Sequence, residues 1–131
     1  MSYKVTLNCK NCNSKKSFVV GQKRSDAIIG NIISELSQNN KDRMNKIIIE
    51  DNLLSFTFYR ELGLCEECKE YYAVPILNIY TKSGDIVRLE GECPKCGSNP
   101  KVYHILDDES SIKCLDCDMG DIEISTENIY D

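Results

Sequence analysis

The sequence predicts a small α+β protein, mostly β, in which antiparallel hairpins alternate with cysteine-containing turns and one amphipathic helix is inserted. Three observations support this class. Several short segments alternate apolar and polar side chains as strands do. All eight cysteines fall in four C-x-x-C pairs, and one stretch, about residues 25–39, repeats its apolar side chains at helical spacing. At 131 residues the chain suits one domain or two small ones.

Strands are predicted over most of the chain. The segment 53–60 alternates best, because Leu54, Phe56 and Phe58 fall on one side and Ser55, Thr57 and Tyr59 on the other. In chain order the predicted strands are 3–7, 16–20, 46–50, 53–60, 72–80, 86–89, 101–106 and 122–125. Residues 126–131 offer few apolar anchors, so we expect the tail to be frayed.

The inserted helix is predicted over about residues 25–39. Ser25 is placed to cap its N-terminus, and Asp26 in the first turn favours the helix dipole. The residues at helical spacing on one face are Ala27, Ile28, Ile29, Ile32, Ile33 and Leu36. We expect this face to pack on the protein's own sheet, and Asn39 and Asn40 to end the helix.

The four C-x-x-C pairs are the strongest signal in the sequence. A C-x-x-C turn directs two sulfur atoms into one small volume, and a second such turn completes a tetrahedral cage of four thiolates. The last two pairs are separated by 17 residues, 97–113, which lies within the spacing of known four-cysteine zinc sites. Eight cysteines therefore predict two closed metal sites.

Three pairings of these turns are open. Sequential closure gives one site from Cys9, Cys12, Cys65 and Cys68, and another from Cys93, Cys96, Cys114 and Cys117. Nested closure joins the two middle pairs and leaves the two terminal pairs to meet, and a crossed scheme is the third. We favour sequential closure, because the last spacing already fits and loop closure favours near neighbours.

The succession of strand, cysteine turn and strand resembles the zinc-ribbon superfamily. The C-terminal likeness covers about residues 86–125, and the turn Cys93-Pro94-Lys95-Cys96-Gly97 is similar to those of rubredoxins and many ribbons. The resemblance implies two ribbon-like units. The first, residues 1–70, would contain the inserted helix and a hairpin, and the second, residues 71–131, a hairpin and a ribbon. Ribbon scaffolds serve many functions, so the likeness identifies no single one.

The predicted cofactors are two zinc ions, with iron as an alternative in the Cys93–Cys117 site, because both metals accept tetrahedral thiolates. A closed four-thiolate site leaves no open position for a catalytic water, so we expect no enzyme activity. His104 and the acidic turn 107–109 are interpreted as an ordinary strand residue and a polar turn. Iron would make the chain a rubredoxin-like electron-transfer protein.

Charge divides the chain unevenly. Residues 1–24 carry six basic side chains and no acid, whereas residues 25–131 carry ten basic and all 21 acidic side chains. The basic corner predicts a second function, weak nucleic-acid contact in a transcription-related ribbon. The candidate contacts are Lys10, Lys15, Lys16, Lys23 and Arg24. Because the acidic remainder repels nucleic acid, we favour a non-catalytic adaptor or regulator that binds a protein partner.

The sequence also predicts a compartment. No apolar run approaches the length of a membrane span, and residues 1–20 lack the apolar core of a signal peptide. Many cysteines without an export signal fit a reducing environment better than a disulfide framework. We therefore expect a cytoplasmic protein with no membrane partner.

Overall fold

The computed structural model describes residues 2–103, 112–117 and 122–129, and these form a mostly antiparallel β structure with few helices. The predicted class, α+β and mostly β, is confirmed. In chain order the elements are β1 (Ser2–Cys9), β2 (Lys15–Gly21), the 3-10 helix η1 (Arg24–Ala27), α1 (Ile29–Ile33), α2 (Gln38–Ile49), β3 (Leu53–Cys65), β4 (Glu70–Thr81), β5 (Ile86–Glu90), β6 (Lys101–Tyr103) and β7 (Ile122–Ile129).

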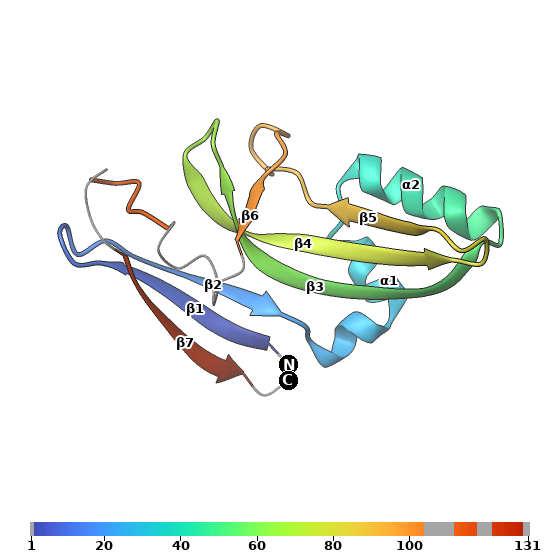
Figure 1. Ribbon diagram of the computed structural model, residues 1–131, viewed down its shortest axis with the longest axis horizontal. Coiled ribbons are helices and arrows are strands. Elements are labelled where there is room, and N and C mark those ends of the chain that lie inside the picture. The colour runs from blue at the N-terminus through green and yellow to red at the C-terminus, as the bar shows by residue number, and fades with distance from the viewer. Residues whose placement is uncertain (1, 104–111, 118–121, 130–131) are drawn as a thin grey trace.

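One sheet runs through the molecule in the order β5-β4-β3-β2-β1-β7, and β6 pairs with β3. Figure 1 shows two parts: β1, β2 and β7 on one side, and the long β3–β4 hairpin with β5 on the other. The strand pairing between these parts is narrow, because β2 and β3 share a single register pair, Gly21 with Arg60.

The last strand corrects the prediction of a frayed tail. Thr126 to Ile129 belongs to β7, which pairs with β1 from Cys9–Ile122 to Ser2–Ile129. The two ends of the described chain therefore lie side by side, as Figure 1 shows. Backbone pairing with β1 orders a segment whose own side chains are mostly exposed.

The β3–β4–β5 sheet follows the predicted alternation except at Leu54, which is exposed because the register shifts between Leu53 and Ser55. The strands predicted at 53–60, 72–80 and 86–89 lie within β3, β4 and β5. Phe58, Leu77 and Leu89 fall in one cross-strand row on the face that packs against the helices. Ile32 and Leu36 with Met44 of α2 complete this core.

The helical region differs from the prediction. The single helix over 25–39 is wrong: Ile28 has extended backbone (φ −105°, ψ 116°), which separates η1 from α1. A new helix, α2, begins after Ser37, whose Oγ accepts a hydrogen bond from Asn40 N at 3.3 Å. Ser37 therefore caps α2, whereas Ser25, the predicted cap, lies inside η1.

The strand predicted at 46–50 is also wrong, because these residues form the end of α2 and its C-cap. Met44 and Ile47 are three residues apart and both meet the core, whereas Ile49 is 82% exposed. Tertiary packing on a helical face thus overrides the strand propensity of three consecutive isoleucines.

A second core lies under β1 and β2, where Val5, Leu7 and Val20 meet Leu62, Tyr71, Tyr103 and Ile112. The β3–β4 hairpin contributes to both cores, and it contains residue 70, the predicted boundary between the units 1–70 and 71–131. The division into units 1–70 and 71–131 stays a prediction. Among the described residues, none of the helices has the length and apolar character that crossing a membrane requires.

Candidate metal sites

The eight cysteines form two clusters of four. In the first cluster, Cys9 and Cys12 meet Cys114 and Cys117; in the second, Cys65 and Cys68 meet Cys93 and Cys96. Within each cluster the four Sγ atoms lie within 4.8 Å of one another, and all eight cysteines are free thiols. Sγ–Sγ distances such as 3.6 Å from Cys9 to Cys117 and 3.4 Å from Cys65 to Cys96 are too long for a disulfide bond of about 2.05 Å. Each cluster can therefore surround one metal ion.

This pairing is the nested one, so the prediction of sequential closure is wrong. Strand register explains the result. Pairing of β1 with β7 brings Cys9 beside Ile122, five residues after Cys117. The β3–β4 hairpin places the Cys65 turn at its tip, and β5 returns antiparallel to β4 towards Cys93. These sheet contacts outweigh the modest loop-closure advantage of near neighbours.

The first cluster joins the two ends of the described chain. Its N-terminal turn is closed by hydrogen bonds from Cys9 N to Ser14 O (2.8 Å) and from Asn13 N to Cys9 O (3.0 Å). Asn13 takes a positive φ of 60°, a conformation that asparagine tolerates better than most residues. Cys9 and Cys114 are buried, whereas Cys12 is exposed. The cluster therefore lies at the surface, with its two inner sulfurs against the protein.

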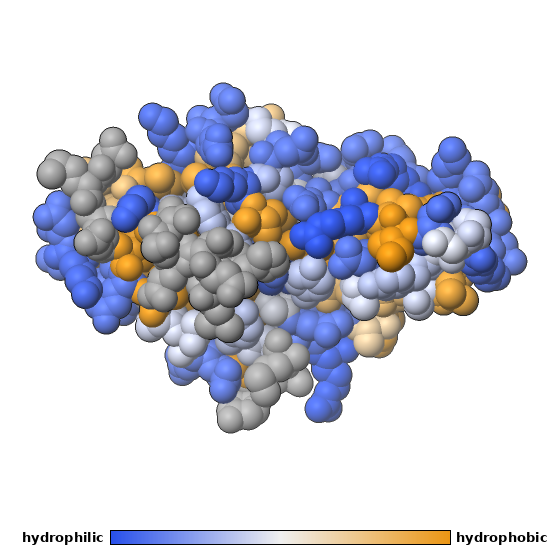
Figure 2. All heavy atoms as spheres, in the orientation of Figure 1, coloured by the Kyte–Doolittle hydropathy of each residue, from blue (hydrophilic) through white to orange (hydrophobic). Residues whose placement is uncertain are grey.

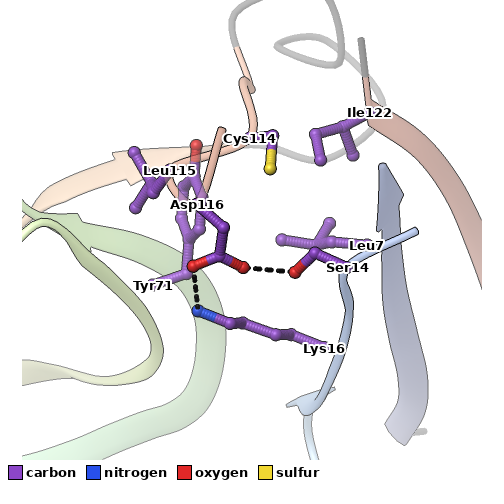
Figure 3. A pocket seen from close by; sticks show the side chains of 8 residues that line it. All are labelled: Leu7, Ser14, Lys16, Tyr71, Cys114, Leu115, Asp116 and Ile122. Atoms are coloured by element: carbon purple, nitrogen blue, oxygen red, sulfur yellow. Dashed lines mark hydrogen bonds and ion pairs between the residues drawn. The ribbon is translucent and has the colours of Figure 1, made fainter. Parts of the chain in front are cut away.

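Contacts between polar side chains join the two cysteine turns of the first cluster. Asp116, between Cys114 and Cys117, accepts a hydrogen bond from Ser14 Oγ and lies 3.7 Å from Lys16 Nζ. Figure 3 shows these contacts over a small cavity of about 20 Å³ lined by Leu7, Tyr71 and Ile122. The Ser14 hydroxyl and the Lys16 ammonium lower the pKa of Asp116. Asp116 therefore links the turn from one end of the chain to the turn from the other.

Tyr71 holds the segment that leads into Cys114. Its hydroxyl donates to Lys113 O at 2.8 Å and accepts from Lys113 N at 3.1 Å. Desolvation raises the pKa of the Tyr71 hydroxyl. The phenol therefore fixes both backbone groups of the residue before a cluster cysteine.

The second cluster is built by the same rules. Its second turn is closed by Gly97 N donating to Cys93 O and Cys93 N donating to Ser98 O, both at 2.9 Å. Gly97 has a φ of 76°, which favours glycine. Lys95, inside the second turn, pairs with Glu70 at 2.6 Å, just after the first turn. Each cluster thus has at least one ion pair that links its two cysteine turns or the strands beside them.

Four crowded thiols do not ionise alike. The contact with Cys96 raises the pKa of Cys68 to about 12, and desolvation acts in the same direction. The Ser98 hydroxyl, 3.3 Å from Cys96 Sγ, lowers the pKa of Cys96 to about 6. The thiolate of Cys96 therefore forms readily, whereas that of Cys68 requires a nearby positive charge, as a metal ion supplies.

The candidate nucleic-acid residues lie in two places. Lys10, Lys15 and Lys16 surround the first turn and the start of β2, whereas Lys23 and Arg24 follow the other end of β2. Lys10 lies 4.0 Å from Glu123, and Lys16 pairs with Asp116. Nucleic-acid contact by these five residues stays a prediction. His104 and the acidic turn 107–109 lie outside the described residues, as do residues 104–106 of a predicted strand whose described part is β6.

Fold and clusters together define a small, mostly β chain with two candidate four-cysteine metal sites, consistent with a zinc-ribbon-like arrangement. Comparisons with protein-family models, with curated proteins and with solved structures give no match. The class therefore rests on the geometry of the chain itself.

Sequence reasoning missed the side chains that support the clusters. Asp116 and Lys95 occupy inner positions of C-x-x-C turns, which is a signal, but their partners depend on strand register. The buried ion pair of Arg60 with Asp26 was missed as well, because these residues are 34 positions apart.

Proposed function

We propose that this chain is a small zinc-stabilised, non-catalytic adaptor or regulatory protein that acts by binding another protein. The observation that carries the proposal is the gathering of all eight cysteines into two four-sulfur clusters, each formed by two C-x-x-C turns from distant parts of the chain. Such sites hold elements together and use every coordination position for the protein.

The sulfur positions suit a metal held by four tetrahedral thiolates, such as zinc. Four thiolates bound to zinc at about 2.3 Å lie about 3.8 Å apart in a tetrahedron. Sγ–Sγ contacts of 3.6 Å between Cys12 and Cys114 and 3.9 Å between Cys68 and Cys93 are close to that spacing. Two zinc ions with eight thiolates would leave each site with two negative charges.

Metal analysis tests this part of the proposal. Protein purified in reducing buffer should be colourless and contain two zinc ions per chain. One zinc ion or none would contradict it. A red protein containing iron would instead support rubredoxin-like electron transfer.

The non-catalytic part follows from coordination. A metal held by four cysteine thiolates has no position for a water or substrate unless a ligand leaves. Zinc here would stabilise the turns and the strands next to them, as structural zinc does in small domains that fold around it.

The charge distribution supports a protein partner. Residues 25–131 are strongly acidic, which disfavours nucleic acid but permits contact with a basic protein surface. On the face shown in Figure 2, hydrophilic side chains separate the apolar patches, a pattern that favours recognition through mixed polar and apolar contacts.

Affinity purification from native cells, with and without nuclease, tests the partner. We expect the same protein to be retained in both samples. A matched variant, Lys15→Glu with Lys23→Glu and Arg24→Glu, leaves the Lys16–Asp116 pair intact and should keep that partner. If nuclease treatment or this variant abolishes retention of the partner protein, nucleic-acid binding explains the data better than an adaptor function.

A further inference from the structure

We propose that a hollow beside the second cysteine cluster binds one lysine or arginine side chain of the protein partner. This inference rests on the adaptor function proposed above and names the chemistry that the partner presents. The hollow lies where the helices, the edge of β4 and the Cys93 turn come together.

The hollow combines acidic groups with apolar walls. It has a volume of about 360 Å³, within the range of about 300–1,000 Å³ typical of ligand pockets. Glu35 and Glu92 supply carboxylates, and Tyr72, Pro75 and Pro94 supply apolar surface. Lysine and arginine match this lining, because their aliphatic stems pack on apolar surface while their charged ends reach polar groups.

Arg60, which also lines the hollow, does not cancel its acidity. The Arg60 side chain is 8% exposed, and its guanidinium donates to Asp26 at 3.0 and 3.3 Å and from Nε to Glu35 at 3.2 Å. One positive charge thus faces two negative ones, and this group of three has a net charge of −1.

Glu92, which lines the hollow, adds a second negative charge to the site. The hydrogen bond that the structure gives its carboxylate comes from Asn39 Nδ2, at a long 3.5 Å. A neutral amide at that distance compensates the charge poorly. The nearby cation of the Cys93 turn, Lys95, is already paired with Glu70 at 2.6 Å. A basic side chain from outside would therefore find an available carboxylate.

A second hollow, of about 380 Å³, shares Glu92 with the first and continues it along the start of α2. Figure 1 shows the neighbouring parts, α2, β5 and the orange segment that follows β5. A hydrogen bond from Asn40 Nδ2 to Glu90 O (3.1 Å) joins α2 to the end of β5. Arg43 and Arg88 line this second hollow. These two arginines disfavour a basic side chain in the second hollow, so the two hollows together favour a single basic residue over a polybasic stretch.

Peptide titration tests the inference. The probe is the capped pentapeptide Ala-Ala-Lys-Ala-Ala, together with versions carrying arginine, norleucine or glutamate at the centre. Each is added to the metal-loaded, ¹⁵N-labelled chain, and the amide signals of Ala73, Gly91 and Glu92 are followed. We expect saturable shifts with lysine and arginine, and at least threefold weaker binding with norleucine, which has the same apolar stem without the charge.

Glu92→Gln is the matched variant, because it removes one charge and keeps the side chain's shape. We expect it to weaken the lysine peptide at least threefold. Glu127→Gln, an exposed acid on β7, should leave the affinity unchanged. Unchanged metal content and amide dispersion show that both variants are folded.

Three results would overturn the inference: equal binding of the norleucine peptide, wild-type affinity in Glu92→Gln, or shifts confined to other residues. The adaptor function fails separately. If the peptides do not bind but a partner is still retained after nuclease treatment, only the hollow was assigned wrongly. If no protein partner is retained, the adaptor function is wrong whatever the peptides do.

Discussion

Asp116 and Lys95 lie at equivalent places in the two clusters, each inside a C-x-x-C turn and each paired with a residue that belongs to the opposite side of its cluster. Asp116 contacts Ser14 and Lys16, and Lys95 contacts Glu70. Exposed ion pairs add little to global stability, but here each one spans the two halves of a candidate metal site. We therefore expect these side chains to affect metal retention more than folding.

The first prediction compares the two bridges. Asp116→Asn should speed metal loss to a chelator from the first cluster about twofold to fivefold, the range expected for an exposed charge pair, and leave the second cluster unchanged. Glu70→Gln should speed metal loss from the second cluster by a similar factor and leave the first cluster unchanged. Amide signals of Asn11 and Cys12 report the first cluster during the chelator challenge, and those of Lys95 and Gly97 report the second. Equal effects on both clusters from either variant would contradict this local role.

The second prediction concerns Tyr71. Tyr71→Phe keeps the ring in its core but removes the hydroxyl that bonds both backbone groups of Lys113. We expect a loss of about 1 kcal/mol in the free energy of unfolding, because two part-buried hydrogen bonds to the backbone of Lys113 are lost. Chemical denaturation of the metal-loaded protein measures it. Tyr80→Phe, on the half-buried outer side of β4, is the control and should change stability by less.

At the scale of elements, a buried ion pair fastens the helices to the sheet. Arg60 of β3 bonds Asp26 of η1 and Glu35 after α1, and its guanidinium lies 4.9 Å from the centre of the Phe58 ring. Asp26 also accepts from Lys23 N at 2.7 Å, which fixes the start of η1. One arginine thus orients the whole segment between β2 and α2.

The third prediction follows from this burial. Asp26→Asn leaves the guanidinium of Arg60 short of one carboxylate in a site where both side chains are less than a tenth exposed. We expect a loss of about 1.5–3 kcal/mol, because buried hydrogen bonds to a charged group are lost while Glu35 still pairs with Arg60. Asp51→Asn breaks an exposed pair with Lys82 and should cost less than about 1 kcal/mol. Similar losses in the two variants, measured by urea denaturation, would show that burial does not decide the effect.

Elements that follow from local pattern were predictable, whereas those decided by partners were not. The alternation in 53–60 places Leu54, Phe56 and Phe58 on one face, and the structure confirms this for Phe56 and Phe58. It is wrong for Leu54, which is 66% exposed, because a register shift between Leu53 and Ser55 puts Leu53 against the core instead. Ile47, Ile48 and Ile49 looked like a strand, but the cap at Ser37 and the core contact of Met44 make them helical. The cysteine turns were predictable in the same way as the strands, because a C-x-x-C spacing is itself local.

At the scale of the whole molecule, the pairing of those turns was not predictable from spacing. Loop closure changes slowly with length, so its preference for neighbours is worth little against a row of backbone hydrogen bonds. The register of β1 with β7 commits Cys9 to the C-terminal turn, and no pattern within either segment announces this pairing. The first cluster therefore joins the N-terminal cysteine turn to the C-terminal one, and the second joins the tip of the β3–β4 hairpin to the Cys93 turn.

The last prediction uses this division of labour. Removal of the first cluster by Cys114→Ser with Cys117→Ser should lower the zinc content from two ions to one. Hydrogen exchange should then rise in β1 and β7, because the strand-to-strand contact of their part with the rest of the sheet is the single Gly21–Arg60 pair. The core of β3, β4 and α2 should stay protected, since it packs without the first cluster.

The matched variant, Cys93→Ser with Cys96→Ser, should instead raise exchange at the β3–β4 tip around Cys65 and Glu70 and leave β1 and β7 protected. Mass-resolved exchange distinguishes these outcomes from sequential pairing, in which loss of Cys114 and Cys117 would deprotect the Cys93 turn as strongly as β1. That result would mean that the nested clusters are not the metal sites of the folded protein.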